Sequence, residues 1–127
     1  MSSAHPDFAN VASENVSSAD ILKLLQEKTP EAIKTLNGRL LEIDAERGVA
    51  RFRFEIVPAF CHSDGKICQG GFLTGMVDTS MAHAAIAKGL LRVAVPTLEI
   101  KVNYLRPTRP GRVHAEATIV RLGRIVG

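Results

Sequence analysis

Aromatic residues are scarce in this sequence, which has no tryptophan and one tyrosine among its 127 residues. Proteins that bind single-stranded nucleic acid stack bases on aromatic side chains, so this scarcity argues against that function. The sequence also lacks a run of five like charges, and its net charge of +3 is spread along the chain. We therefore expect no nucleic-acid partner, and the modest positive excess only weakly supports an anionic ligand.

Cysteine is rare too, since Cys61 and Cys68 are the only two. The N-terminus is polar and lacks the apolar segment of a signal peptide, so we expect a cytoplasmic protein whose thiols are free. With His62, the cysteines could supply three zinc ligands, but no fourth ligand stands at a recognisable spacing. The sequence therefore predicts neither a metal nor another cofactor.

One apolar stretch, residues 72–91, has about the length of a membrane span. Asp78 lies near its centre, His83 and Lys88 follow, and glycine and alanine stand where leucine and valine would be expected. A buried core helix accounts for this pattern better than a membrane helix, so no membrane insertion is expected.

The chain length and a hydrophobic content of 46% fit one domain with a substantial core. Residues 1–17 are small and polar without a period, which predicts a flexible tail before a single domain at residues 18–127. Asp20 is expected to cap a short helix. Pro30 is expected at the first position of a second helix, which Asn37 and Gly38 end.

Strand patterns dominate the rest of the domain. Residues 39–45 and 50–56 form two predicted strands joined by a turn at residues 46–48, and residues 58–66 form a loop. A long apolar helix is predicted over residues 70–90, and period-two patterns return at residues 98–104 and 112–119. A single apolar helix must be buried by the strands, so the pattern predicts an α+β protein whose curved antiparallel sheet wraps around one central helix, with a short helical lead.

Asp78 is the most informative single residue, because it stands in the apolar helix two turns after Gly70 and Gly71. A carboxylate there is costly to bury without a partner or a purpose. Glycines at a helix start leave backbone N–H groups uncovered, and such groups can hold a developing negative charge. The segment therefore offers an oxyanion site together with a base or nucleophile. The structural alternative is an acid held by Thr79 or Ser80, or paired across a dimer.

The segment from Gly38 to the end resembles hotdog-fold thioesterases of the 4-hydroxybenzoyl-CoA thioesterase superfamily, in particular the branch of phenylacetate-pathway acyl-CoA thioesterases. The residues that carry the resemblance are Gly65, Gln69-Gly70-Gly71, residues 78–83 (DTSMAH), residues 98–107 (LEIKVNYLRP), Gly111 and residues 121–124 (RLGR). The resemblance implies the hotdog fold and hydrolysis of an acyl-CoA thioester. It assigns the carbonyl-polarising N–H to Gly70 or Gly71, and the base or nucleophile to Asp78.

The sequence departs from the family pattern at several positions. Gln69 stands where the family has a histidine, and Ser63 falls near its loop asparagine or glutamine. Ala82 replaces a small hydroxyl residue one turn after the acid, although Thr79 and Ser80 lie nearby. The family continues with two more strand segments, whereas this sequence ends at Gly127. We therefore expect either a truncated sequence or a sheet that lacks a strand and has an exposed edge.

Helix geometry separates the two proposed halves of the site. Seven residues at about 1.5 Å each place Gly71 roughly 10 Å from Asp78, too far for both to act on one carbonyl. A neighbouring antiparallel helix of a second chain would bring the two together. We therefore expect a homodimer or homotetramer with shared sites, in agreement with the family.

The remaining candidates concern the substrate. The residues expected near the substrate are Gln69, Ser63, His62, Thr79 and Ala82. Gln69 is expected to orient the acyl group or the carbonyl by a hydrogen bond. Arg106 and Arg109 are candidates for the CoA phosphates, with Arg121 and Arg124 as further choices, although exposed strand ends are the ordinary setting for such residues. His83 is expected in the core or an interface. A non-catalytic acyl-CoA binder or sensor is the main alternative function, and a hotdog dehydratase is a weaker one.

Overall fold

The computed structural model describes residues 16–89, 91 and 94–123, so most of the predicted tail and residues 124–127 lie outside the described part. The elements, in chain order, are α1 (Ser18–Glu27), α2 (Glu31–Thr35), β1 (Gly38–Asp44), β2 (Val49–Ile56), the 3-10 turn η2 (Pro58–Phe60), β3 (Cys61–His62), β4 (Ile67–Cys68), α3 (Gly70–Lys88) and β5 (Gly111–Thr118). Within these residues, no helix combines the length and the apolar character that crossing a membrane would need.

The sheet contains β1, β2 and β5 in the order β1-β2-β5, with antiparallel pairing throughout. Every second residue of the central strand β2 is buried, namely Ala50, Phe52, Phe54 and Ile56. The opposite face is charged, since Arg51 contacts Glu42 at 3.2 Å and Glu116 at 2.8 Å on the two neighbouring strands. The alternation in the sequence therefore correctly predicts which face of the sheet meets the core.

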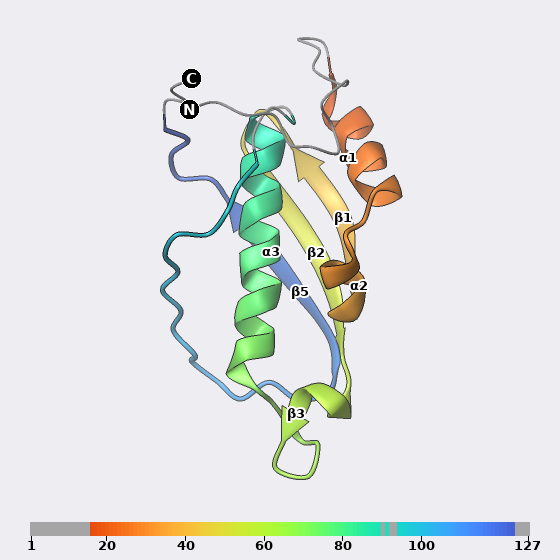
Figure 1. Ribbon diagram of the computed structural model, residues 1–127, viewed down its shortest axis with the longest axis vertical. Helices are drawn as coiled ribbons and strands as arrows, with labels where there is room; N and C mark the ends of the chain where they lie inside the picture. The colour runs from red at the N-terminus through yellow and green to blue at the C-terminus, as the bar shows by residue number, and fades with distance from the viewer. Residues whose placement is uncertain (1–15, 90, 92–93, 124–127) are drawn as a thin grey trace.

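Helix α3 lies across the apolar face of the sheet (Figure 1). Its buried residues are Met76, Ser80 and the run from His83 to Ala87. His83 packs edge-on against Phe52, with 4.9 Å between the ring centroids, and the Nδ1–H of His83 donates to the Thr79 carbonyl at 3.0 Å. This arrangement confirms the α+β prediction of an antiparallel sheet around a central helix, with His83 in the core.

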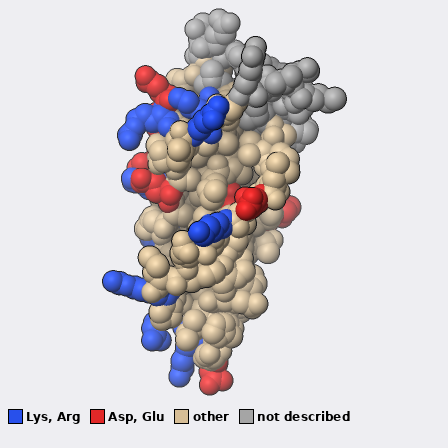
Figure 2. Space-filling view, turned by 90° about the vertical axis from the view of Figure 1, so that its left-hand side faces the viewer, with Lys and Arg blue, Asp and Glu red and all other residues tan. Residues whose placement is uncertain are grey.

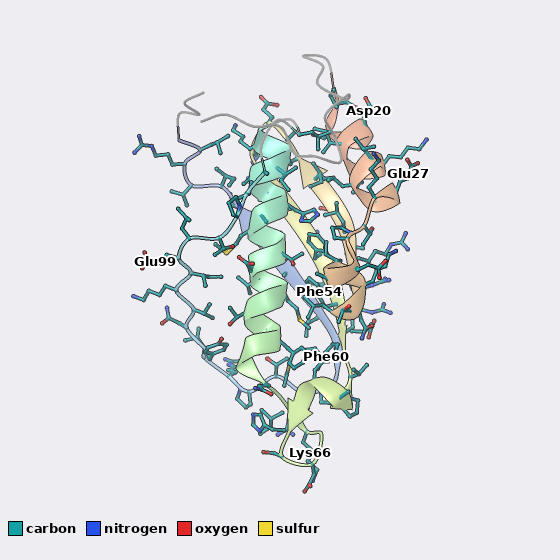
Figure 3. The ribbon with its side chains drawn as sticks, in the orientation of Figure 1. Asp20, Glu27, Phe54, Phe60, Lys66 and Glu99 are labelled. Carbon is teal, nitrogen blue, oxygen red and sulfur yellow. The ribbon has the colours of Figure 1, made fainter. Side chains whose placement is uncertain are left out.

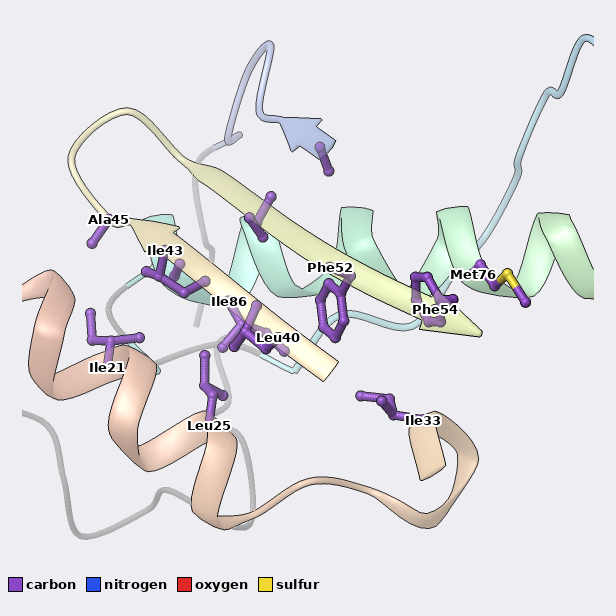
Figure 4. Close-up of a cluster of buried hydrophobic side chains, with 14 of the residues drawn as sticks. Ile21, Leu25, Ile33, Leu40, Ile43, Ala45, Phe52, Phe54, Met76 and Ile86 are labelled. Atoms are coloured by element: carbon purple, nitrogen blue, oxygen red, sulfur yellow. The ribbon is translucent and has the colours of Figure 1, made fainter. Parts of the chain in front are cut away.

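Two N-terminal helices close the side of the core beside β1. Ile21 and Leu25 of α1 project toward Leu40 and Ile43 of β1 (Figure 4), and Ile33 of α2 lies beside Gly38 at the start of β1. The prediction that Asp20 caps the first helix is wrong. Ser17 is the N-cap, and its hydroxyl accepts from the Asp20 N–H at 3.1 Å. The Asp20 carboxylate in turn accepts from the Ser17 N–H. A hydroxyl at the N-cap and an acid at N3 thus satisfy two backbone N–H groups at once. Pro30 is likewise the N-cap of α2 rather than its first helical residue.

The predicted loop at residues 58–66 is more ordered than expected, since it contains η2 and most of a small hairpin of β3 and β4. Ser63, Asp64 and Gly65 make its turn with φ of 56°, 60° and 74°. This left-handed backbone suits glycine and short polar side chains, so the turn chemistry was readable from the residue types.

The prediction of a strand at residues 98–104 is wrong in the described structure. This segment runs outside the sheet along α3, and its Glu99 points away from the helix (Figures 1 and 3). Leu98 is 97% exposed and Leu105 is 89% exposed. An alternating pattern specifies which side chains share a face, but a strand forms only where a partner edge is available. Among the described strands, β5 pairs with β2 alone and is an edge strand of the sheet.

Candidate active site

Asp78 is half-buried on α3 and faces the segment that follows the helix. The Thr97 hydroxyl donates a hydrogen bond to the Asp78 carboxylate. Both side chains line a cavity of about 520 Å³ whose other walls are mostly apolar. Its lining residues from α3 are Met81, Ala82, Ala84 and Ala85, those from the following segment are Val95, Pro96, Leu98 and Glu99, and those from the C-terminal side are Ala117, Thr118, Ile119, Val120 and Arg121.

The N-terminus of α3 is formed by Gln69, Gly70 and Gly71. Gln69 is the N-cap, but its side chain makes no capping hydrogen bond. Among the described residues, the N–H groups of Gly70 and Gly71 have no hydrogen-bond acceptor, and a Cβ added at Gly71 would meet nothing within 4 Å. The start of a helix also carries a partial positive charge. The position can therefore accept an anionic oxygen from outside.

The side chain of Tyr104 covers Gly70. Its hydroxyl donates to the Gly70 carbonyl at 3.0 Å and is also hydrogen-bonded to the Thr74 hydroxyl. A Cβ added at Gly70 would lie 3.1 Å from the Tyr104 ring, so the glycine permits this close approach. Sequence reasoning missed Tyr104 as a site residue because it was assigned to a strand, although it is the chain's single tyrosine and stands two residues before Arg106.

A second pocket of about 390 Å³ lies beside this helix start. It is lined by Ile67, Cys68, Gly70, Leu73 and residues 104–108. Arg106 is therefore close to the helix N-terminus, whereas Arg109 is not one of the lining residues. Both side chains are exposed. The cation at Arg106 and the helix start together favour an anionic group in this pocket.

The two halves of the expected site do not meet within one chain. Gly70 lines the smaller pocket and Asp78 lines the larger one. Residues 71 and 78 belong to the same helix, and its rise of about 1.5 Å per residue separates them by roughly 10 Å.

Only some of the remaining sequence candidates line these two pockets. Ala82 lines the cavity of Asp78, and Thr79 supplies the carbonyl that accepts from His83. His62 and Ser63 are exposed in the hairpin, where His62 Nδ1 and Ser63 Oγ lie 2.9 Å apart, near the tip that Lys66 marks in Figure 3. Neither of them lines the cavity of Asp78. Arg121 does line it, and Arg124 lies outside the described residues.

Cys61 and Cys68 are free thiols, the first half-buried and the second buried. In the described part of the chain, no three histidine, cysteine or acidic side chains are grouped so that they could hold a metal ion. The set of Cys61, His62 and Cys68 therefore forms no such group.

Comparisons with known proteins bear on the family and the fold. Residues 65–127 match the thioesterase superfamily. A phenylacetic acid degradation-related protein from Ralstonia eutropha JMP134 is 26% identical, with a TM-score of 0.74 over 82% of this chain and 80% of that one. The TT0310 protein from Thermus thermophilus is 26% identical, with a TM-score of 0.64 over 75% and 76% of the two chains.

The PaaI protein of the E. coli phenylacetic acid degradation operon is 20% identical, with a TM-score of 0.73 over 86% of this chain and 77% of that one, a likeness that shows the fold. No curated protein matches the chain.

Proposed function

Since residues 65–127 match the thioesterase superfamily and the described domain has the hotdog fold, the chain belongs to that superfamily, and we propose that it hydrolyses an acyl-CoA thioester to the free acid and CoA. The observation that carries the proposal is the open start of α3, where Gly71 is uncovered, in the same helix as a carboxylate that a hydroxyl orients.

The proposed reaction uses these groups in a fixed order. The N–H groups of Gly70 and Gly71 hold the thioester oxygen as negative charge develops on it. The Asp78 carboxylate takes a proton from water, the resulting hydroxide adds to the carbonyl carbon, and the carbon–sulfur bond then breaks to release the CoA thiolate, which is protonated. Direct attack by Asp78, through an acyl anhydride that water then hydrolyses, uses the same geometry.

A second copy of the chain completes this site in the proposal. The separation of Gly71 from Asp78 along one helix is the main support, because both must lie within about 3 Å of the reacting atoms. Val77 and Met81 are exposed on α3, and Leu98 is exposed on the neighbouring segment. The face seen in Figure 2 is mostly uncharged, with Lys and Arg gathered along one edge. We propose a homodimer or homotetramer in which this face is covered.

The two pockets suggest where the parts of the substrate bind. The apolar walls beside Asp78 suit an acyl group, since Ala82 and Ala85 leave space there. Arg106 beside the helix start suits a CoA phosphate, with Arg109 as an exposed second cation. We propose that Gln69, whose side chain makes no capping hydrogen bond, donates to the substrate from its amide. A cytoplasmic location stays a prediction of the sequence.

The test measures the rate at which free CoA thiol is released from a panel of short, medium and aromatic acyl-CoAs. Wild type and Asp78→Asn are assayed side by side. We expect turnover by wild type and loss of about a hundredfold or more in kcat for the variant, because a missing general base costs this much. Circular dichroism of both proteins controls for folding.

An acyl-CoA binder without catalysis is the second candidate, because Gln69 and Ala82 replace a histidine and a hydroxyl residue expected from the family. Calorimetric binding of an acyl-CoA by folded wild type with no thiol release across the panel would contradict the hydrolase and support the binder.

A further inference from the structure

Cys61 and Cys68 lie directly opposite each other in the small hairpin that precedes α3. The Gln69 N–H donates to the Phe60 carbonyl at 2.9 Å, and these two residues flank the cysteine pair. The Cys68 N–H does not bond to the opposite strand of the hairpin but donates to the Thr108 carbonyl at 2.7 Å. The cysteines therefore form a non-hydrogen-bonded pair of an antiparallel ladder, the kind of pair in which side chains are closest.

This position fits the geometry of a disulfide. The Cα atoms of a non-hydrogen-bonded pair are about 4.5 Å apart. Disulfides join cysteines whose Cα atoms are about 4.4 to 6.8 Å apart. The turn between the two strands holds this pairing in place through Ser63, Asp64 and Gly65, all of which have left-handed backbone.

The two thiols have different surroundings, which gives them different roles. Cys68 is 4% exposed and its Sγ lies 3.6 Å from the Gln69 carbonyl, whereas Cys61 is half-buried and its Sγ lies 3.5 Å from the Val57 carbonyl. Burial raises the pKa of the Cys68 thiol, and the nearby Cys61 thiol adds to the shift. A small oxidant therefore reaches Cys61 first, and Cys68 is the thiol that reacts second.

We propose that Cys61 and Cys68 are a reversible dithiol–disulfide site for small disulfides of the glutathione class, placed immediately before the helix start that carries Gly70 and Gly71. The Cys61 thiolate attacks one sulfur of the oxidised compound, forms a mixed disulfide and releases one small thiol. The Cys68 thiolate then attacks Cys61 Sγ, closes the intramolecular bond and expels the second small thiol. The balance is two protein thiols and one small disulfide converted into one protein disulfide and two small thiols.

The test incubates the folded, reduced protein with oxidised glutathione and measures free thiols, intact mass and the linked peptide. We expect both thiols to be lost, a mass lower by two hydrogen atoms, no retained glutathione and no interchain bond on a non-reducing gel. Reduced dithiothreitol should restore both thiols. A stable glutathione adduct on Cys61 beside a free Cys68, or a disulfide between chains, would overturn the proposal.

Two matched variants separate the steps. Cys68→Ser should keep glutathione on Cys61, whereas Cys61→Ser should react slowly because its remaining thiol is buried. In wild type, the rate of disulfide closure should keep rising with pH after the rate of glutathione addition to Cys61, measured in Cys68→Ser, has levelled off. The reason is that the raised pKa of Cys68 shifts formation of its thiolate to higher pH. The readouts do not depend on catalysis, so the failure of this site and the failure of the proposed hydrolase are distinguishable.

Discussion

At the scale of single residues, the carboxylate of Asp78 is held by the hydroxyl of Thr97, which lies nineteen positions further along the chain. A hydrogen bond to a charged group orients that group. Thr97 is exposed, so water competes with this contact and the energy at stake is at the lower end of the usual range. Thr97 therefore acts on the proposed reaction through Asp78, as a positioning residue.

Thr97→Val should lower kcat about tenfold while leaving KM close to its wild-type value. The reason is that a hydrogen bond to a charged group contributes about 1.5 kcal/mol, close to a factor of ten in rate. Steady-state kinetics with the best acyl-CoA of the panel measures this effect. Thr97→Ser is the matched control, because it keeps the hydroxyl and should restore the rate. Wild-type kcat in Thr97→Val would show that the contact has no part in the reaction.

At the scale of elements, the two glycines that begin α3 differ although they are adjacent. Gly70 is covered by the Tyr104 ring, and Gly71 is open. Tyr104 also bonds to the Gly70 carbonyl, so the segment after α3 is fastened to the helix at its N-terminus, while Thr97 connects it to Asp78 two turns further on. The segment is thus attached to α3 at two points without forming a strand.

Gly70→Ala should be less stable than Gly71→Ala, even though both changes place alanine in the first turn of the same helix. Alanine at the open position gains up to about 0.5 kcal/mol from helix propensity. Alanine at the covered position must displace the Tyr104 ring from a 3.1 Å contact. Thermal unfolding of both variants, alone and combined with Tyr104→Ala, measures the difference. It should disappear when Tyr104 is removed, and equal stability with Tyr104 present would contradict the packing argument.

At the scale of the whole molecule, one chain holds an anion-accepting helix start and an acid-bearing apolar cavity in two separate pockets. The charged outer face of the sheet suits solvent, whereas the face that carries residues 97–106 is mostly uncharged (Figure 2). This asymmetry is the pattern expected where two copies meet.

Mixing two inactive variants tests whether the site is shared. Gly71→Pro removes one N–H at a position in the first helical turn where proline is tolerated, and Asp78→Asn removes the carboxylate. Each variant alone should be inactive. If sites are shared, equal mixing with subunit exchange should restore about a quarter of wild-type activity, because half of the dimers are mixed and each has one complete site. Activity that stays at the level of the separate variants would contradict a shared site.

Much of the molecule was predictable from local pattern. Phe52 and Phe54 alternate with arginines, so β2 and its buried face were correctly predicted. The apolar run after Gly71, interrupted by Asp78 and His83, indicated a core helix, and α3 is one. Such predictions succeed because the side-chain period of a helix or strand depends on the backbone alone.

The order of the amino acids was enough to predict the sheet faces, the central helix, the glycine-rich helix start and the superfamily. The folded chain was needed to show that residues 98–104 run outside the sheet, that Thr97 and Tyr104 bond to Asp78 and Gly70, and that Cys61 faces Cys68. One cause accounts for each of these cases. The hydrophobic period of a sequence shows which face of a helix or strand a side chain occupies. The strand or side chain that it contacts depends on which distant segment of the folded chain supplies a strand edge, a hydroxyl or a thiol nearby.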